Sequence, residues 1–145
     1  MTTGLDVFDH TVQKTNLWLK SIEERLQLED RRVAYLALRG VLHALRDRIG
    51  PENAVHLGAQ LPMLIRGLYY EGWRMGTQTK ERHIEQFVDR IWSDLRNAPP
   101  VDPQAAARAV FDVMWDKLDP GEIAKVIELM PSELRYLWPQ PARVR

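Results

Sequence analysis

Cysteine is absent from this chain of 145 residues. Disulfide bonds, thiolate nucleophiles and cysteine-ligated metal centres are therefore excluded. A domain of this length buries roughly two-thirds of the surface that its unfolded chain exposes, so it can fold without a disulfide or a metal. With 45% hydrophobic and 28% charged residues, the composition is that of an ordinary globular protein rather than a disordered one.

An excess of either charge is also absent, since 20 lysines and arginines balance 20 aspartates and glutamates. A neutral chain has no overall field to attract nucleic acid or an anionic membrane. No window approaches the run of about 18 apolar residues that a spanning helix needs, and residues 1–6 lack the basic and apolar stretches of a signal peptide. We therefore expect a cytoplasmic protein with no membrane partner, and nucleic acid ranks last among its partners.

Common catalytic motifs are missing as well. The sequence contains no Gly-x-Ser-x-Gly elbow, no phosphate-binding glycine loop and no nucleotide fingerprint. It also lacks His-Glu-x-x-His and the paired Glu-x-x-His motifs of di-iron bundles. The four histidines are scattered, and a pair such as Glu52 with His56 would supply only two ligands to a metal. We predict no catalytic residues, no metal and no cofactor, which argues against an enzyme of a common type.

An internal repeat is the clearest pattern that is present. Shifting the sequence by 69 residues places residues 15–69 on residues 84–138 without a gap, and ten pairs of residues are then identical. Apolar side chains in both copies recur at steps of three and four, which predicts the core face of an amphipathic helix. In the first copy these are Phe8, Val12, Thr15, Leu19, Ile22 and Leu26, and in the second Ile84, Val88, Ile91 and Leu95.

Helix boundaries repeat with the same offset. Pro51 and Pro120 each stand just inside a new helix, where the missing backbone donor costs nothing. Asp30 and Asp102 are the predicted N-caps of the second helix in each copy. Each copy is therefore expected to contain two long helices followed by two short ones.

The predicted fold class is all-α, a compact helical domain of two tandem pseudo-repeated four-helix units sharing one core. Unit one covers about residues 5–73 and unit two about residues 80–138, within a single domain of residues 1–145. The glycines and threonines of residues 71–80 allow a turn between the units. A unit of this size cannot cover its own apolar face, so the two copies are expected to pack together.

Aromatic residues gather at the end of the first copy, where we place a candidate interaction surface of Arg66, Tyr69, Tyr70 and Trp73. Aromatic and arginine side chains carry much of the binding energy at contacts between proteins. The alternative is that the aromatic residues pack one unit against the other, because Tyr69 aligns with Trp138 as a repeated packing position.

Arginines and aspartates are the polar positions that both copies keep. A guanidinium with five donors can tie helix ends together or bind carboxylate and phosphate groups, and we favour structural pairing between these residues. They are Arg39 and Arg66 with their repeats Arg108 and Arg135, and Asp47 with its repeat Asp116.

A candidate polar pocket for an anionic group consists of Arg39, His43 and His56. The second helix also carries a basic stripe, which we interpret as a solvated face rather than a nucleic-acid site. Its members are Arg31, Arg32, Arg39, Arg46 and Arg48.

Two segments carry a family resemblance. They are residues 32–48, RVAYLALRGVLHALRDR, and residues 59–73, AQLPMLIRGLYYEGW. Both resemble a bacterial family classed as domain of unknown function 2267, and residues 111–138 look like the C-terminal half of that family. The resemblance implies a small helical bacterial protein of the cytoplasm and supplies no catalytic residues.

Three functions remain open from the sequence. The first is a non-enzymatic protein-interaction module with an unknown protein partner, and self-association to a homo-oligomer is one form of it. The second is a binder of small anionic ligands, or an enzyme, with a pocket between the two units. The third is nucleic-acid binding through the arginine-rich second helix, which the zero net charge disfavours.

Overall fold

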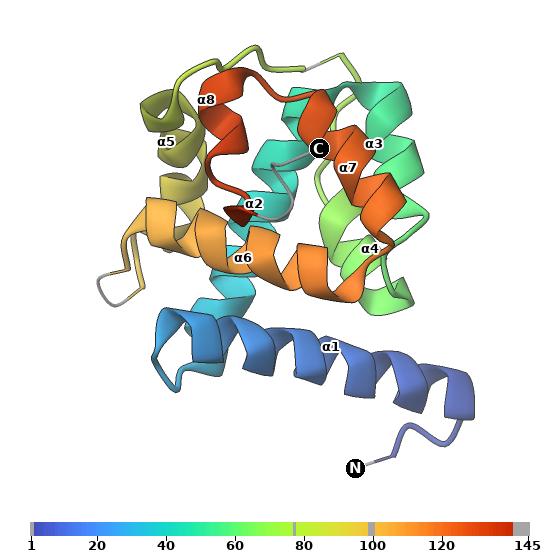
Figure 1. Ribbon diagram of the computed structural model, residues 1–145. Coiled ribbons are helices and arrows are strands. Elements are labelled where there is room, and N and C mark those ends of the chain that lie inside the picture. Colours follow the sequence, from blue (N-terminus) through green and yellow to red (C-terminus); the bar gives the residue numbers. More distant parts are fainter. Residues whose placement is uncertain (1, 77, 99–100, 141–145) are drawn as a thin grey trace.

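The computed structural model describes residues 2–76, 78–98 and 101–140 of the chain. These residues form eight α-helices and no strand, so the all-α fold class is confirmed (Figure 1). The helices are α1 (Asp6–Leu26), α2 (Arg31–Ile49), α3 (Pro51–Gly58), α4 (Met63–Tyr70), α5 (Ile84–Leu95), α6 (Pro103–Lys117), α7 (Pro120–Glu128) and α8 (Ser132–Arg135).

The predicted helix starts are confirmed. The Asp30 carboxylate accepts a hydrogen bond from the backbone of Val33, and Asp102 accepts from Gln104 and Ala105. Pro51 and Pro120 occupy the first positions of α3 and α7. Capping and proline chemistry therefore determine where these helices begin.

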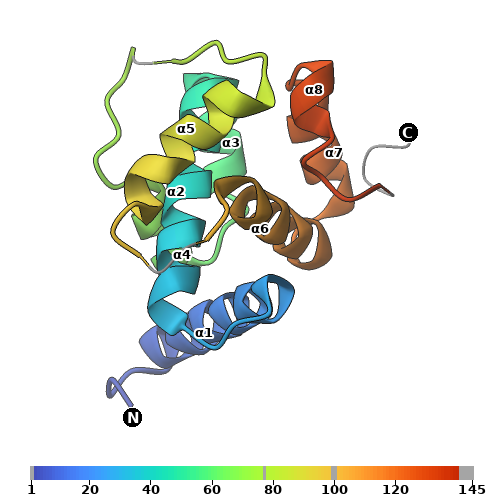
Figure 2. The same cartoon turned by 90° about the vertical axis from the view of Figure 1, so that its left-hand side faces the viewer.

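Helix α2 lies at the centre of the molecule. It packs against α1, α3, α4, α5 and α6, and Figures 1 and 2 show it surrounded by these helices. Its apolar face is fully buried at Leu38, Val41, Leu42 and Leu45. Burial of side chains from every long helix in one continuous cluster makes the domain compact.

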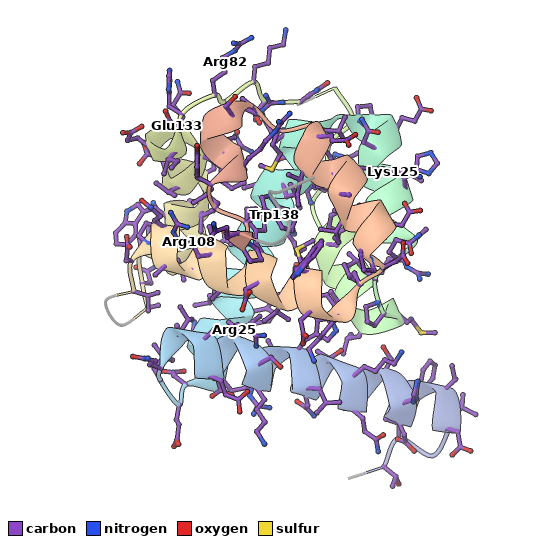
Figure 3. The ribbon with its side chains drawn as sticks, in the orientation of Figure 1. Arg25, Arg82, Arg108, Lys125, Glu133 and Trp138 are labelled. Atoms are coloured by element: carbon purple, nitrogen blue, oxygen red, sulfur yellow. The ribbon has the colours of Figure 1, made fainter. Side chains whose placement is uncertain are left out.

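A pair of stacked aromatic rings packs α6 against the residues that follow α8. The rings of Phe111 and Trp138 lie 4.0 Å apart and are parallel within 1°. Trp138 and Tyr69 are both fully buried. On the other face of α6, Arg25 of α1 forms an ion pair with Asp112, and Figure 3 shows Arg25 between the two helices.

Helix α1 departs from the sequence prediction at its N-terminal end. Leu19 and Ile22 are buried, as the apolar stripe predicts, but Phe8 is 48% exposed and Val12 is 38% exposed. The reason is length, because α1 has 21 residues and its first turns project past the end of α6 (Figure 1). The assignment of Phe8 and Val12 to a core face is therefore wrong.

Candidate functional site

The predicted aromatic cluster is divided between core and surface. Tyr69 is fully buried, and its hydroxyl donates to the Ala54 carbonyl at 2.7 Å. Tyr70 is half-buried between Tyr69, which it meets edge-on with the ring centres 5.0 Å apart, and Trp73, on which it stacks at 5.6 Å. Tyr69 therefore belongs to the core, while Tyr70 and Trp73 are partly exposed at the surface of the protein.

Tyr70 is accommodated because residue 58 is glycine. A Cβ atom added to Gly58 would lie 2.2 Å from the Tyr70 hydroxyl oxygen and 2.7 Å from its Cζ. No side chain larger than hydrogen fits there without a shift of the tyrosine. The close approach of α3 to the end of α4 thus depends on Gly58.

Arg66 ties helix ends together. Its Nε donates to the Gly58 carbonyl at 2.9 Å and its terminal nitrogen donates to the Leu61 carbonyl at 2.9 Å. In the second half of the chain, Arg135 binds the carbonyls of Met130 and Glu128 in the same way. Both guanidinium groups satisfy carbonyls that a helix end leaves unpaired.

The three residues of the predicted polar pocket do not converge. Arg39 pairs with Asp94 at 2.6 Å and with Glu71 at 3.5 Å. His43 is half-buried, and its Nε2–H donates to the Leu68 carbonyl at 2.8 Å. His56 is exposed and lines a separate cleft of about 230 Å³ between α3 and α7. The fold places these three residues in different surroundings.

The surroundings of His43 favour the neutral form of its imidazole. Burial lowers the pKa of His43 from its ordinary value of 6.5, and the positive charges of Arg46 and Arg39 act in the same direction. The hydrogen bond to Leu68 and the charge of Asp94 oppose the shift but do not reverse it. An uncharged histidine in this position is suited to tying α2 to α4 rather than to holding an anion.

A buried ion cluster lies where the sequence analysis expected a solvated arginine. Arg46 is 5% exposed and Asp47 is 7% exposed, and their side chains meet at 2.9 Å. Arg46 also donates to the carbonyls of Tyr69 and Glu71, while Asp47 accepts from Arg90 of α5 at 2.8 Å. The cluster therefore joins α2 to α5 and to the end of α4.

The predicted pairs for the repeated arginines are not the pairs observed. Asp47 binds Arg46 and Arg90 instead of Arg39 or Arg66, and Asp116 lies 4.0 Å from Arg25. The sequence does contain a feature from which the buried cluster could have been predicted. Arg46 and Asp47 are adjacent in α2 and follow a run of apolar residues on the buried face of that helix. Arg46 lies one turn after Leu42, which is itself fully buried.

An apolar groove of about 600 Å³ lies between α1, α2 and α4. Helix α4 begins over α1, where the Leu64 backbone donates to the Thr11 hydroxyl at 3.0 Å. The residues that line the groove are Thr15 and Leu19 of α1, Tyr35 and Leu38 of α2, Leu64, Ile65, Gly67, Leu68 and Tyr70 of α4, and Glu71.

The mouth of this groove exposes large apolar side chains. Tyr35 is 40% exposed and Leu64 is 48% exposed. Phe8 and Val12 continue the α1 stripe that enters the groove at Thr15, because residues three and four apart share a helix face. We call these two residues the α1 ridge and refer to the ridge and the groove together as the groove face. Only its Tyr70 was predicted from the sequence.

Gly67 lines the groove without a side chain of its own. A Cβ atom added there would meet no atom within 4 Å. Glycine is thus not required by packing against the rest of the protein at this position. Its backbone is exposed along α4, so that another chain can approach the helix closely.

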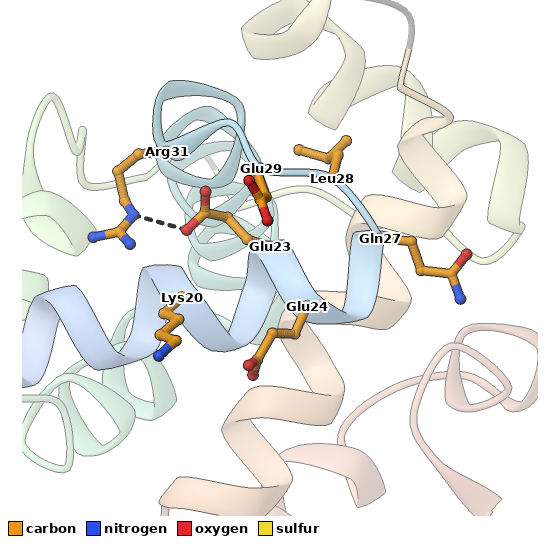
Figure 4. A pocket seen from close by; sticks show the side chains of 7 residues that line it. All are labelled: Lys20, Glu23, Glu24, Gln27, Leu28, Glu29 and Arg31. Atoms are coloured by element: carbon orange, nitrogen blue, oxygen red, sulfur yellow. Dashed lines mark hydrogen bonds and ion pairs between the residues drawn. The ribbon is translucent and has the colours of Figure 1, made fainter.

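Other cavities among the described residues have charged side chains in their linings. One of about 660 Å³ lies at the turn between α1 and α2 and is lined mainly by charged side chains, among which Glu23 binds Arg31 at 2.8 Å (Figure 4). The residues that the structure describes include no group of three or more histidine or acidic side chains placed to hold a metal ion. None of the described helices is long and apolar enough to cross a lipid bilayer.

Comparison with known proteins relates this chain to a family. No curated protein matches the sequence of this chain. Residues 15–137 match a family described as an uncharacterized conserved protein, DUF2267. The match starts at Thr15 and so leaves the α1 ridge outside it. Because the match covers most of the 145 residues, the chain belongs to the DUF2267 family.

Proposed function

We propose that this protein is a non-enzymatic helical interaction module that binds another protein chain through its groove face. The observation that carries the proposal is an apolar groove with Tyr35 and Leu64 exposed in its lining, together with the exposure of Phe8 and Val12 on the α1 stripe that leads into it. Monomeric proteins rarely leave a large continuous apolar patch in water, and such patches mark interaction sites. An open groove between helices is suited to an amphipathic helix.

The lining of the groove favours a protein over a small polar ligand. A ligand pocket places a few polar groups around an otherwise apolar cavity. Glu71 is the charged residue in this lining, and it already faces Arg39 at 3.5 Å. Of the four residues predicted to form an interaction surface, Tyr70 lines this groove. Arg66 donates hydrogen bonds to backbone carbonyls instead, and Trp73 stacks on Tyr70.

The arrangement of the helices supports two tandem units. Helices α3 and α7 begin at residues 51 and 120, and α4 and α8 begin at residues 63 and 132, so each pair is 69 residues apart. Helix α5 begins at Ile84, which corresponds to Thr15. The first nine residues of α1, Asp6 to Lys14, thus have no counterpart in the second unit, and they contain the α1 ridge. We propose that this extension serves binding in the bacterial cytoplasm.

A second candidate function, binding of a small anionic ligand, is supported by a different cleft. This cleft of about 420 Å³ lies between α1, α6 and the turn before α4. Lys14, Arg66 and Lys117 line it, and no carboxylate of the described residues does. A thermal-shift screen of carboxylates and phosphates tests this function. A stabilisation that is lost in Lys14→Gln and Lys117→Gln supports it, and no stabilisation by any anion rejects it.

Photo-crosslinking tests the interaction function. A photoreactive amino acid is placed at Leu64 on the groove face or at Val55 on α3, two exposed apolar positions on different helices. We expect adducts with protein in the native cell from position 64 and not from position 55. Adducts that form equally from both positions, or from neither, would reject the groove face as a binding surface.

A further inference from the structure

The groove face combines exposed apolar side chains with an apolar groove. Phe8 and Val12 of the α1 ridge are exposed, and Leu19, Tyr35 and Leu68 line the groove. Resting on the proposed function, we infer that the chain bound in the groove is a second copy of this protein, paired through α1 in an antiparallel, two-fold arrangement. A two-fold contact uses the same patch on both copies, so ridge and groove must lie on one face.

Placing the α1 ridge of each copy in the groove of the other defines a register for this pairing. In an antiparallel pair, the ridge at Phe8 of one copy meets the other copy near Leu19, and Val12 and Thr15 lie close to the two-fold axis. Small and medium side chains at the axis allow the two helices to approach closely. Phe8 then enters the groove of the partner copy between Tyr35 and Leu68.

Charges on α1 support the same orientation. Asp9 and Lys20 are 11 residues apart, close to three full turns, and so they lie on one flank of the helix. In the antiparallel register given above, Asp9 of each copy lies about two residues along the helix from Lys20 of the other, within reach of the long lysine side chain. Parallel pairing would place like charges together, which is unfavourable.

Both charges are available for such a contact. Asp9 accepts a hydrogen bond from the Thr3 backbone, and its carboxylate has no ion pair within the described part of the chain. Lys20 likewise makes no ion pair among the described residues, and Figure 4 shows it beside the pair formed by Glu23 and Arg31. The net charge of zero leaves no overall repulsion between two copies.

Sedimentation equilibrium of the full chain over a range of concentrations is the first test. We expect a dimer for the wild type and for Val55→Glu, which adds a charge to an exposed valine of α3. Val12→Glu places two carboxylates at the two-fold axis and is expected to weaken the dimer by about 30-fold or more. Circular dichroism spectra and melting temperatures of the two variants show whether each remains folded.

A charge exchange tests the antiparallel register. Asp9→Lys alone puts a second lysine beside Lys20 of the other copy, and Lys20→Asp alone puts a second aspartate beside Asp9. Each variant by itself is therefore expected to dimerise less than wild type. In a mixture of the two variants, every such contact between unlike copies joins opposite charges. We expect the mixture to form heterodimers, and failure of mixing to restore association would overturn the register.

The outcomes separate this inference from the proposed function. A wild-type protein that stays monomeric at all concentrations overturns the second copy as the occupant. Photo-crosslinks from Leu64 to a different protein would then leave the groove as an interaction surface. A dimer that Val12→Glu does not weaken would instead show that the copies meet on another face.

Discussion

Asp47 of α2 binds Arg90 of α5 at 2.8 Å, and its second carboxylate oxygen binds the buried Arg46. The contact between Asp47 and Arg90 holds α5 against the central helix α2. Because α2 also lines the groove through Tyr35 and Leu38, the cluster keeps in place a helix on which the proposed binding surface is built.

Removal of Asp47 is expected to destabilise the fold strongly. Asp47→Ala leaves the Arg46 guanidinium buried without its carboxylate, and loss of one partner from a buried pair costs about 3 kcal/mol or more. The free energy of unfolding in urea measures the effect. Arg90→Gln is the control, since Arg90 is 40% exposed and its loss is expected to cost about 1 kcal/mol or less. Equal costs for the two variants would contradict this description of the cluster.

Two glycines are expected to respond in opposite ways to the same substitution. Gly58→Ala forces a methyl group against Tyr70 and should lower the free energy of unfolding by about 2 kcal/mol. Gly67→Ala meets no atom and should raise it by about 0.5 to 1 kcal/mol, because alanine favours the helix. Denaturant unfolding of both variants provides the comparison. A stable Gly58→Ala protein would mean that Tyr70 does not pack on α3 as described.

Stability is expected to decrease in mildly acidic solution because of His43. The pKa of His43 is lowered in the folded chain by burial, whereas the unfolded chain has the ordinary value of 6.5. Below 6.5 the unfolded state therefore binds more protons, and stability falls as the pH decreases from 6.5 toward the folded pKa. Above 6.5 the contribution is fully present.

His43→Gln should remove this dependence while keeping a donor for the Leu68 carbonyl. Urea unfolding of wild type and variant between mildly acidic and neutral pH measures the difference. The lowered pKa of Glu133, whose carboxylate accepts from the Ile84 backbone, acts in a separate window below 4.5. A variant with the same pH dependence as wild type would show that His43 is not responsible.

Local structure could be predicted from the sequence because its causes are local. Asp30 and Asp102 cap helices with their own side chains, and Pro51 and Pro120 fit the first turn of a helix but not its interior. The apolar spacing of α1 correctly identified one face of a helix. It could not indicate how far that face is covered, because coverage depends on the lengths of α4 and α6 and on where they cross α1.

The candidate site was harder to predict for the same reason. The groove is formed by three helices whose crossing leaves a gap, and its exposed members Phe8, Val12 and Leu64 have the same residue types as core positions. Arg46 is the opposite case. Its charge predicted an exposed side chain, but the guanidinium is buried because Asp47 and the carbonyl of Tyr69 at the end of α4 bind it. Residue type alone does not distinguish an arginine in water from one held by carbonyls.

Hydroxyl-radical footprinting tests the groove face most directly, because the chain carries exposed aromatic and methionine side chains on and away from it. Phe8 and Tyr35 lie on the groove face, whereas Met75 and Trp92 lie outside the groove lining. Dilute purified protein is compared with concentrated protein and with protein in an extract of its own cells. We predict that oxidation of Phe8 and Tyr35 falls on association while that of Met75 and Trp92 is unchanged. Protection of Met75 or Trp92 with no change at Phe8 and Tyr35 would contradict the groove face as the binding surface.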